Sequence, residues 1–94
     1  MPALTTVNVE PFSEKPIAIE YARWRSKRAD YEVTVLEVHH REGPEGGYRT
    51  TVTVQGSKTS PTRRVTWPAG VFQRTFEPVG PKLKIPTRWE RLKA

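Results

Sequence analysis

The chain contains no cysteine, which excludes disulfide bonds, thiol nucleophiles and thiolate metal sites. Small secreted domains are usually held together by disulfides, so this absence favours a reducing compartment. No apolar run approaches the roughly 18–20 residues that span a bilayer, and the N-terminus has no basic segment followed by an apolar one. We therefore expect a cytoplasmic protein that does not enter a membrane.

Residues that carry out catalysis are also scarce. Asp30 is the single aspartate, and the two histidines of the chain, His39 and His40, are adjacent. Neighbouring residues of a strand point to opposite faces, which makes it hard for these histidines to share one metal ion. The glycine motifs that bind phosphates or dinucleotides and the zinc-protease motif do not occur. We expect no catalytic residue, no cofactor and no metal site, and a protein that acts by binding.

Hydrophobic residues make up 35% of the 94 residues, while nine prolines and six glycines interrupt regular structure. Ninety-four residues are enough for one domain, and a chain of this composition closes one small core but cannot also enclose a deep substrate cavity. We therefore expect one β-rich domain over residues 15–79. A flexible N-terminal arm over residues 1–14 and a basic, proline-containing tail over residues 80–94 flank it.

The clearest local pattern predicts a long β-hairpin. Glu32–His39 is rich in β-branched residues, and its apolar period shifts at Leu36, which indicates either a bulge there or a strand covered on both faces. Residues 40–47 contain three glycines and a proline and predict a loop. Tyr48–Gln55 alternates regularly and places one set of side chains on a common face: Tyr48, Thr50, Val52 and Val54.

Shorter patterns predict the other elements, and about five strands in total indicate a mainly β fold. The expected architecture is a small curled antiparallel sheet or a half-open barrel, with one helical turn and extended ends. In the first strand, Ile17, Ile19 and Tyr21 fall on one face and Trp24 on the other. The expected elements are strands over Lys15–Trp24, Arg63–Trp67 and Arg74–Val79, a helical turn over Pro68–Gln73, and a short helix over Thr87–Lys93.

Acidic residues are nearly missing from the second half of the chain. Residues 48–94 hold ten basic residues and two acidic ones, Glu77 and Glu90, for a net charge of +8. Residues 1–47 hold six basic and eight acidic residues, for a net charge of −2. A basic half attracts phosphates or an acidic protein surface, so the expected partner is a protein, a nucleoprotein or a nucleic acid.

The candidate partner-binding residues are basic residues that cluster in the sequence, together with one tryptophan among them. Cations neutralise phosphates and an indole ring stacks on a base, as in nucleic-acid contacts. Two other interpretations remain open: charges at strand ends serve solvation and edge protection, and the tryptophan folds back over an apolar patch. The candidates are Arg23, Arg25, Lys27, Arg28, Arg63, Arg64, Lys82, Lys84, Arg88, Trp89, Arg91 and Lys93.

Six aromatic residues provide most of the large apolar side chains. A domain with few aliphatic residues needs the buried area of its aromatic rings, so we expect these residues to form the core. The alternative is an exposed aromatic platform that binds a ligand. The six residues are Tyr21, Trp24, Tyr48, Trp67, Phe72 and Phe76.

Two segments resemble a group of small phage and prophage proteins. Lys15-Pro16, with Trp24 eight residues after the proline, resembles their K-P-x-x-x-x-A-x-x-W opening, although Tyr21 replaces the usual alanine. The segment Trp67–Val79 (WPAGVFQRTFEPV) resembles their closing T-[FY]-E-P-V region, while the P-G-D-Y stretch of their middle is missing. The resemblance implies a phage or prophage origin, hence the cytoplasm of a host cell, and implies no activity.

Three classes of function agree with these observations. The first is a phage accessory protein that binds a host protein or nucleoprotein, for example to inhibit host defence or the transcription machinery. The second is a nucleic-acid-binding module that acts through the basic half. The third is a virion component whose proline-rich arms contact neighbouring subunits. We favour the first class, with the second as its closest alternative.

Overall fold

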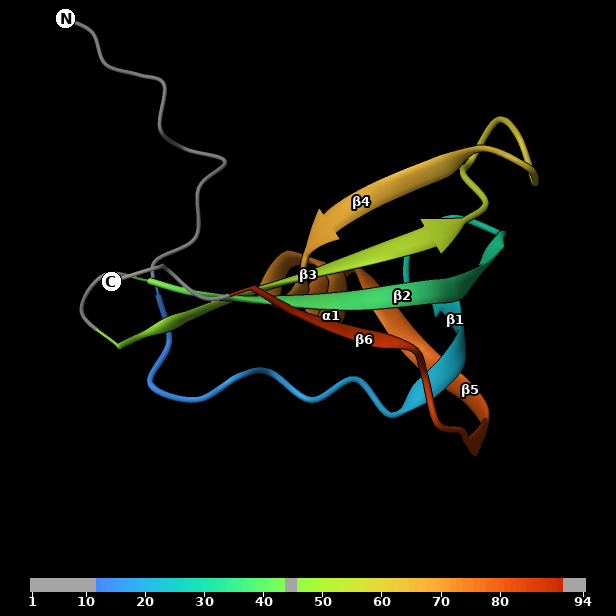
Figure 1. Ribbon diagram of the computed structural model, residues 1–94. Coiled ribbons are helices and arrows are strands. Elements are labelled where there is room, and N and C mark those ends of the chain that lie inside the picture. The colour runs from blue at the N-terminus through green and yellow to red at the C-terminus, as the bar shows by residue number, and fades with distance from the viewer. Residues whose placement is uncertain (1–11, 44–45, 91–94) are drawn as a thin grey trace, which may run out of the picture.

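The computed structural model describes residues 12–43 and 46–90, which form one sheet of six strands and one short helix (Figure 1). The order across the sheet is β4-β3-β2-β1-β5, and β6 pairs with β2. The predicted mainly β fold is confirmed, as an open sheet that is neither curled nor closed into a half-open barrel. The elements are β1 (Tyr21–Ser26), β2 (Glu32–Glu42), β3 (Tyr48–Gln55), β4 (Arg64–Pro68), α1 (Ala69–Thr75), β5 (Phe76–Lys82) and β6 (Thr87–Glu90).

The long hairpin of β2 and β3 is the centre of the sheet, as predicted. The two strands pair antiparallel from Thr34 opposite Gln55 to Glu42 opposite Tyr48. Their register shifts between Val35 and Glu37, which favours the bulge over the other predicted alternative, a strand covered on both faces. The loop is shorter than predicted, because the alternation of buried and exposed residues continues beyond residue 39 and β2 extends to Glu42.

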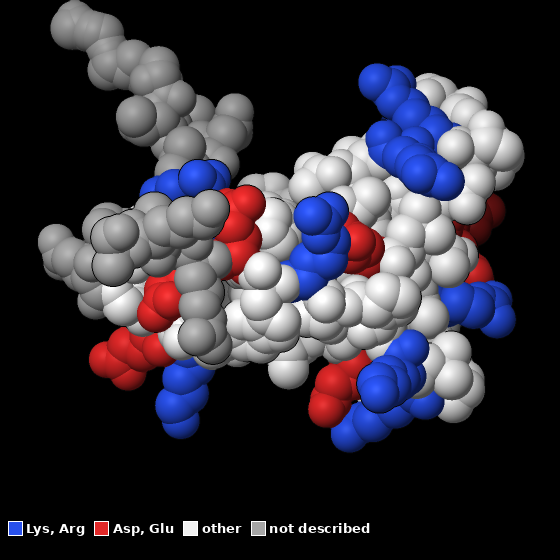
Figure 2. All heavy atoms as spheres, viewed as in Figure 1, with Lys and Arg blue, Asp and Glu red and all other residues white. Residues whose placement is uncertain are grey.

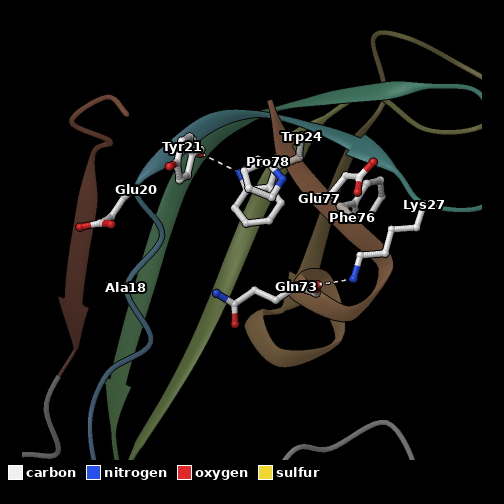
Figure 3. Close-up of a pocket in the computed structure, with 9 residues that line it drawn as sticks. All are labelled: Ala18, Glu20, Tyr21, Trp24, Lys27, Gln73, Phe76, Glu77 and Pro78. Carbon is white, nitrogen blue, oxygen red and sulfur yellow. Dashed lines mark hydrogen bonds between the residues drawn. The ribbon is translucent and has the colours of Figure 1, made fainter. Parts of the chain in front are cut away.

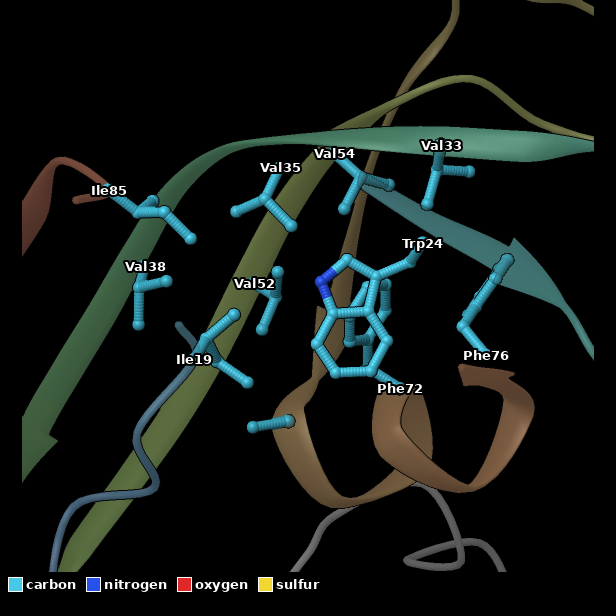
Figure 4. Close-up of a cluster of buried hydrophobic side chains, with 11 residues drawn as sticks. Ile19, Trp24, Val33, Val35, Val38, Val52, Val54, Phe72, Phe76 and Ile85 are labelled. Atoms are coloured by element: carbon cyan, nitrogen blue, oxygen red, sulfur yellow. The ribbon is translucent and has the colours of Figure 1, made fainter. Parts of the chain in front are cut away.

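The core lies between the sheet and α1, and Figure 4 shows the valines of β2 and β3 pointing toward the helix. Phe72 of α1 is fully buried, and its ring packs 4.8 Å from Trp24 and 5.0 Å from Phe76, between ring centroids. Trp67 and Tyr21 are partly buried against this cluster. The prediction of an aromatic core is correct for these five residues. Tyr48 does not join them and packs edge-on against Trp89 instead.

The first strand begins later than predicted. The described residues before Tyr21 have no regular strand structure, and in Figure 1 they form the blue segment that leads into β1. The amide N–H of Ile17 donates a hydrogen bond to Oγ1 of Thr50 (3.1 Å), and Ile19 is buried in the core. Trp24 is buried in the same core, so the prediction that it faces away from Ile19 was wrong. The alternation breaks because the register of β1 shifts after Tyr21.

The segment after Pro68 also has different boundaries. Pro68 is the N-cap of α1, with extended backbone angles, and not its first helical residue. The helix continues to Thr75, beyond the single turn predicted, and β5 begins at Phe76 and ends at Lys82. A helix that continues this far places Phe72 and Phe76 on one side, next to each other in the core.

Residues 80–90 belong to the domain and do not form a separate tail. Ile85 is buried in the core, and the amide of Val38 donates a hydrogen bond to the carbonyl of Pro86 (2.9 Å). From Thr87 onward the chain pairs in parallel with β2, so the expected helix is a strand. Strand β2 is long enough to pair with β1 at its start and with β6 further along the same edge. The rest of that predicted helix, residues 91–93, lies outside the described residues.

Candidate partner-binding surface

The two faces of the sheet differ in what covers them. Strand alternation directs Trp24 and Val65 toward the core, and their neighbours Arg23, Arg25 and Arg64 toward the opposite face. Figure 1 shows α1 behind the sheet, and in the described part of the chain no helix lies on the face toward the viewer. We call this the uncovered face.

Arginines and threonines from five strands come together on the uncovered face. Arg64 of β4, Gln55 of β3, Thr34 of β2 and Arg23 of β1 are successive cross-strand neighbours in one row. Three strand spacings separate the two arginines, which is roughly 14 Å. In a second row, His39 of β2 lies next to Arg88 and Thr51. Residues that are up to 65 positions apart in the sequence therefore share one surface.

Not all of these arginines are available to a partner. Arg23 forms an ion pair with Glu32 (2.8 Å), and the guanidinium of Arg25 lies 3.6 Å from the carboxylate of Asp30. Neither Arg64 nor Arg88 has an ion pair with a carboxylate of residues 12–43 or 46–90. Figure 2 shows the resulting pattern, with blue groups separated by red and neutral surface and one blue group over the start of β4.

The other predicted site residues lie elsewhere. Lys27 and Arg28 follow β1 in the turn, where Nζ of Lys27 donates to the carbonyl of Gln73 (3.4 Å). Arg63 directly precedes β4. Lys82 ends β5 and forms an ion pair with Glu20 (3.4 Å). The structure thus divides the candidates among the uncovered face, two turns and the end of β5. Lys84 is exposed between β5 and β6, and Arg91 and Lys93 lie outside the described residues.

The side chain of Trp89 lies on the side of the sheet that α1 covers. It contacts His40 and Tyr48 at the loop end of the hairpin of β2 and β3. Its ring centroid lies 4.5 Å from that of His40 and 6.2 Å from that of Tyr48, and the residue remains 55% exposed. His40 is 6% exposed, and its Nδ1 lies 2.8 Å from Oγ1 of Thr50, which also accepts the N–H of Ile17. His40 thus connects β2, β3, β6 and the segment that precedes β1.

Lowering the pH is expected to weaken the fold through His40. Burial, and then the charge of His39, lowers the pKa of His40 below its ordinary value of 6.5. The unfolded chain therefore binds the proton more readily, and the free energy of unfolding falls as the pH drops through and below 6.5. Melting temperatures measured from about pH 7 to about pH 5 should decrease. His40→Gln should flatten this dependence, while His39→Gln removes only the smaller of the two causes and should retain most of it.

A groove opens on the covered side, between the segment before β1, β5 and α1 (Figure 3). Its volume is about 500 Å³, and its walls include Tyr21, Trp24 and Phe76. Nε1–H of Trp24 donates to the carbonyl of Tyr21 (2.7 Å), which fixes the indole ring in the wall. Charged groups of both signs, from Glu20, Lys27 and Glu77, lie at the groove, so it has no single electrostatic preference.

Sequence reasoning missed two arginines of the uncovered face. Arg41 and Arg49 are cross-strand neighbours on that face, at the end of the hairpin. Arg41 forms an ion pair with Glu90 (3.0 Å), and the guanidinium of Arg49 lies 4.1 Å from the ring centre of Phe12. The glycine-rich segment 40–47 suggested a loop at this place. Continuing the strand alternation of residues 32–39 by two more residues would have placed Arg41 on the same face as His39.

The described residues contain no group of three histidine, aspartate or glutamate side chains close enough to hold a metal ion. Within the same residues, no helix has the length and hydropathy needed to cross a membrane. The uncovered face presents guanidinium, hydroxyl and amide groups, which donate hydrogen bonds to anions and carbonyl groups, beside the imidazole of His39 and the carboxylate of Glu32.

Comparison with known proteins identifies no family for this chain. No family model matches the sequence, and searches of curated proteins and of solved structures return no match.

Proposed function

We propose that this chain is a non-catalytic accessory protein of phage type that binds a host protein or nucleoprotein through the uncovered face of its sheet. The observation that carries the proposal is the convergence of Arg23, Arg25, Arg64 and Arg88 on one face, beside threonines of β2, β3 and β4. Guanidinium groups bind carboxylates and phosphates with two parallel hydrogen bonds, so both kinds of partner fit.

Arg64 and Arg88 contribute most to this proposed contact. Both are exposed, and neither must give up an intramolecular ion pair with the described residues before it contacts a partner. Arg23 and Arg25, in contrast, must release the carboxylates of Glu32 and Asp30 before they contact an anionic group of the partner. Thr51 and Thr53 of β3 lie on the same face, and their short side chains let a flat partner approach the sheet closely.

The double variant Arg64→Ala/Arg88→Ala tests this proposal. Each lost charge-assisted hydrogen bond costs about 1.5–3 kcal/mol, so capture of the partner should weaken by at least about tenfold. The matched control is Arg28→Ala/Lys84→Ala, which removes the same charge from exposed positions off this face and should bind as the wild type does. Melting curves of both variants show whether the fold is retained.

The capture is carried out from bacterial lysate with and without nuclease. A protein partner that survives nuclease and depends on Arg64 and Arg88 agrees with the proposal. A partner lost with nuclease identifies a nucleic-acid-binding module instead. Equal loss of capture in both double variants would mean that net charge, and not the uncovered face, holds the partner.

A further inference from the structure

The two end strands of the order β4-β3-β2-β1-β5 differ in their capacity to accept another strand. Strand β5 contains Pro78 and Pro81, which have no N–H to donate, and prolines are typical of edges that resist further pairing. Strand β4 forms the other edge, and its residues Arg64–Trp67 all retain their backbone N–H groups. Among the described residues, β3 is the only strand that pairs with β4.

The register shows which groups of β4 point away from β3. The amide of Gly56 donates to the carbonyl of Arg63 (2.7 Å), so these residues form a hydrogen-bonded pair. Hydrogen-bonded and non-hydrogen-bonded pairs alternate along an antiparallel ladder, which makes Val65 and Trp67 the next residues bonded to β3. The N–H and C=O groups of Arg64 and Thr66 therefore point outward. The 3.0 Å contact between Oγ1 of Thr66 and Oγ1 of Thr53 agrees with the closer approach of a non-hydrogen-bonded pair.

The charged side chains in the sequence around this edge are all basic. Residues 46–76, from the end of the hairpin loop through α1, contain five basic residues and no acidic residue. Three of the five lie at the start of β4 or in the turn before it: Lys58, Arg63 and Arg64. All three are exposed, and none forms an ion pair with the described carboxylates.

We propose that the outer edge of β4 binds an extended acidic peptide segment of a partner protein as an additional strand. Main-chain hydrogen bonds to Arg64 and Thr66 supply the pairing, and the cations at the start of β4 select acidic side chains. The half-buried ring of Trp67 offers an apolar contact on the covered side. This site goes beyond the proposed function, because it uses main-chain groups of one edge and not the side chains of the uncovered face.

A second copy of the chain fits this edge less well. Antiparallel pairing of two β4 strands would bring together two segments that both carry Arg63 and Arg64 and lack any acidic residue. Pairing Arg64 of one strand with Thr66 of the other makes the two Arg64 side chains diagonal neighbours, which repel each other with no carboxylate between them. An acidic peptide removes this repulsion and provides carboxylates for the same guanidinium groups.

Amide hydrogen exchange of the full chain tests the site directly. In the free protein, the amides of Arg64 and Thr66 should exchange quickly, while those of Val65 and Trp67 are protected. The probe is a capped nine-residue peptide of glutamates alternating with valine and threonine. At a free concentration of about ten times its dissociation constant, exchange at Arg64 and Thr66 should slow about tenfold.

Variants separate main-chain pairing from other effects. Thr66→Pro removes one outward N–H and should weaken the peptide's affinity by roughly five- to tenfold. Thr66→Val keeps that N–H and removes only the hydroxyl that contacts Thr53, so its affinity should stay within about twofold of the wild type. If Thr66→Pro does not fold, the same peptide with N-methylated residues at alternate positions, tested on the wild type, should fail to bind.

Several results would overturn this proposal. One is slow exchange of Arg64 and Thr66 in the free chain, which would mean that the edge is already occupied, by the chain itself or by a second copy. Peptide binding that leaves these two amides unchanged would place the site elsewhere. Equal binding of a peptide with lysine in place of glutamate would remove the electrostatic argument. Each of these results leaves the test of Arg64 and Arg88 with the natural partner unaffected.

Discussion

Replacing Val52 with aspartate is expected to abolish cooperative folding. Val52 is fully buried in the middle of β3, where its cross-strand neighbours are Val38 and Trp67. A carboxylate at this position loses its hydration and has no nearby cation in the core. Either it takes up a proton or the protein unfolds, and in both cases the free energy of unfolding falls by several kcal/mol. The whole stability of a domain of this size is about 5–15 kcal/mol.

Circular dichroism with thermal melting, together with the spread of amide proton shifts, measures this effect. The control is Thr51→Asp, one residue earlier on the same strand, where the side chain lies on the uncovered face beside His39. That variant should melt with a cooperative transition close to the wild-type one. A Val52→Asp protein that melts as the wild type does would mean that β3 does not pass through the core.

The hairpin was predictable because the sequence patterns that indicate it lie within the two strands themselves. Alternation in Tyr48–Gln55 fixes which side chains face the core, and the shift of period at Leu36 marks a bulge within the same short segment. The burial of Phe72 and Phe76 followed from composition, since a domain with few aliphatic residues has few other large side chains to bury.

The path of the chain ends was not predictable in the same way. Prolines at positions 81 and 86 suggested an irregular tail, although proline is compatible with the last residues of an edge strand and with the residue before a strand. Whether Thr87–Glu90 pairs with anything depends on the length of β2, which extends past β1 and leaves part of its edge open. This open part of the β2 edge exists only in the assembled sheet, so the sequence of residues 87–90 alone does not reveal the pairing.

The candidate surface was predicted in its residue types and not in its arrangement. Clusters such as Arg23 and Arg25 were visible, because alternate positions of a strand share a face. Their ion pairs with Glu32 and Asp30 were not visible, because these depend on how β1 and β2 pair. The row that joins Arg23 to Arg64 needs the order of four strands.

A chain that ends at Lys82 is expected to lose its stable fold. The deletion removes Ile85 from the core, and truncation of a buried isoleucine alone costs about 2–5 kcal/mol. It also removes the bond from the amide of Val38 to Pro86 and the pairing of β6 with β2, and each lost hydrogen bond costs about 0.5–1.5 kcal/mol. The ring of Trp89, which packs on His40, is lost as well. The sum is comparable to the total stability of a small domain.

Three further proteins separate this structural loss from the loss of positive charge. Full-length Lys84→Gln/Arg88→Gln removes two charges while keeping β6, and its melting temperature should change little, because both side chains are exposed and have no ion pair with described residues. Full-length Ile85→Ala keeps every charge and should melt about 8–40 °C lower, at about 4–8 °C per kcal/mol. A chain that ends at Glu90 retains all of β6 and should melt as the full chain does. If the chain that ends at Lys82 also melts like the full chain, residues 83–90 contribute nothing to the fold, and their basic residues become free to act as a binding tail.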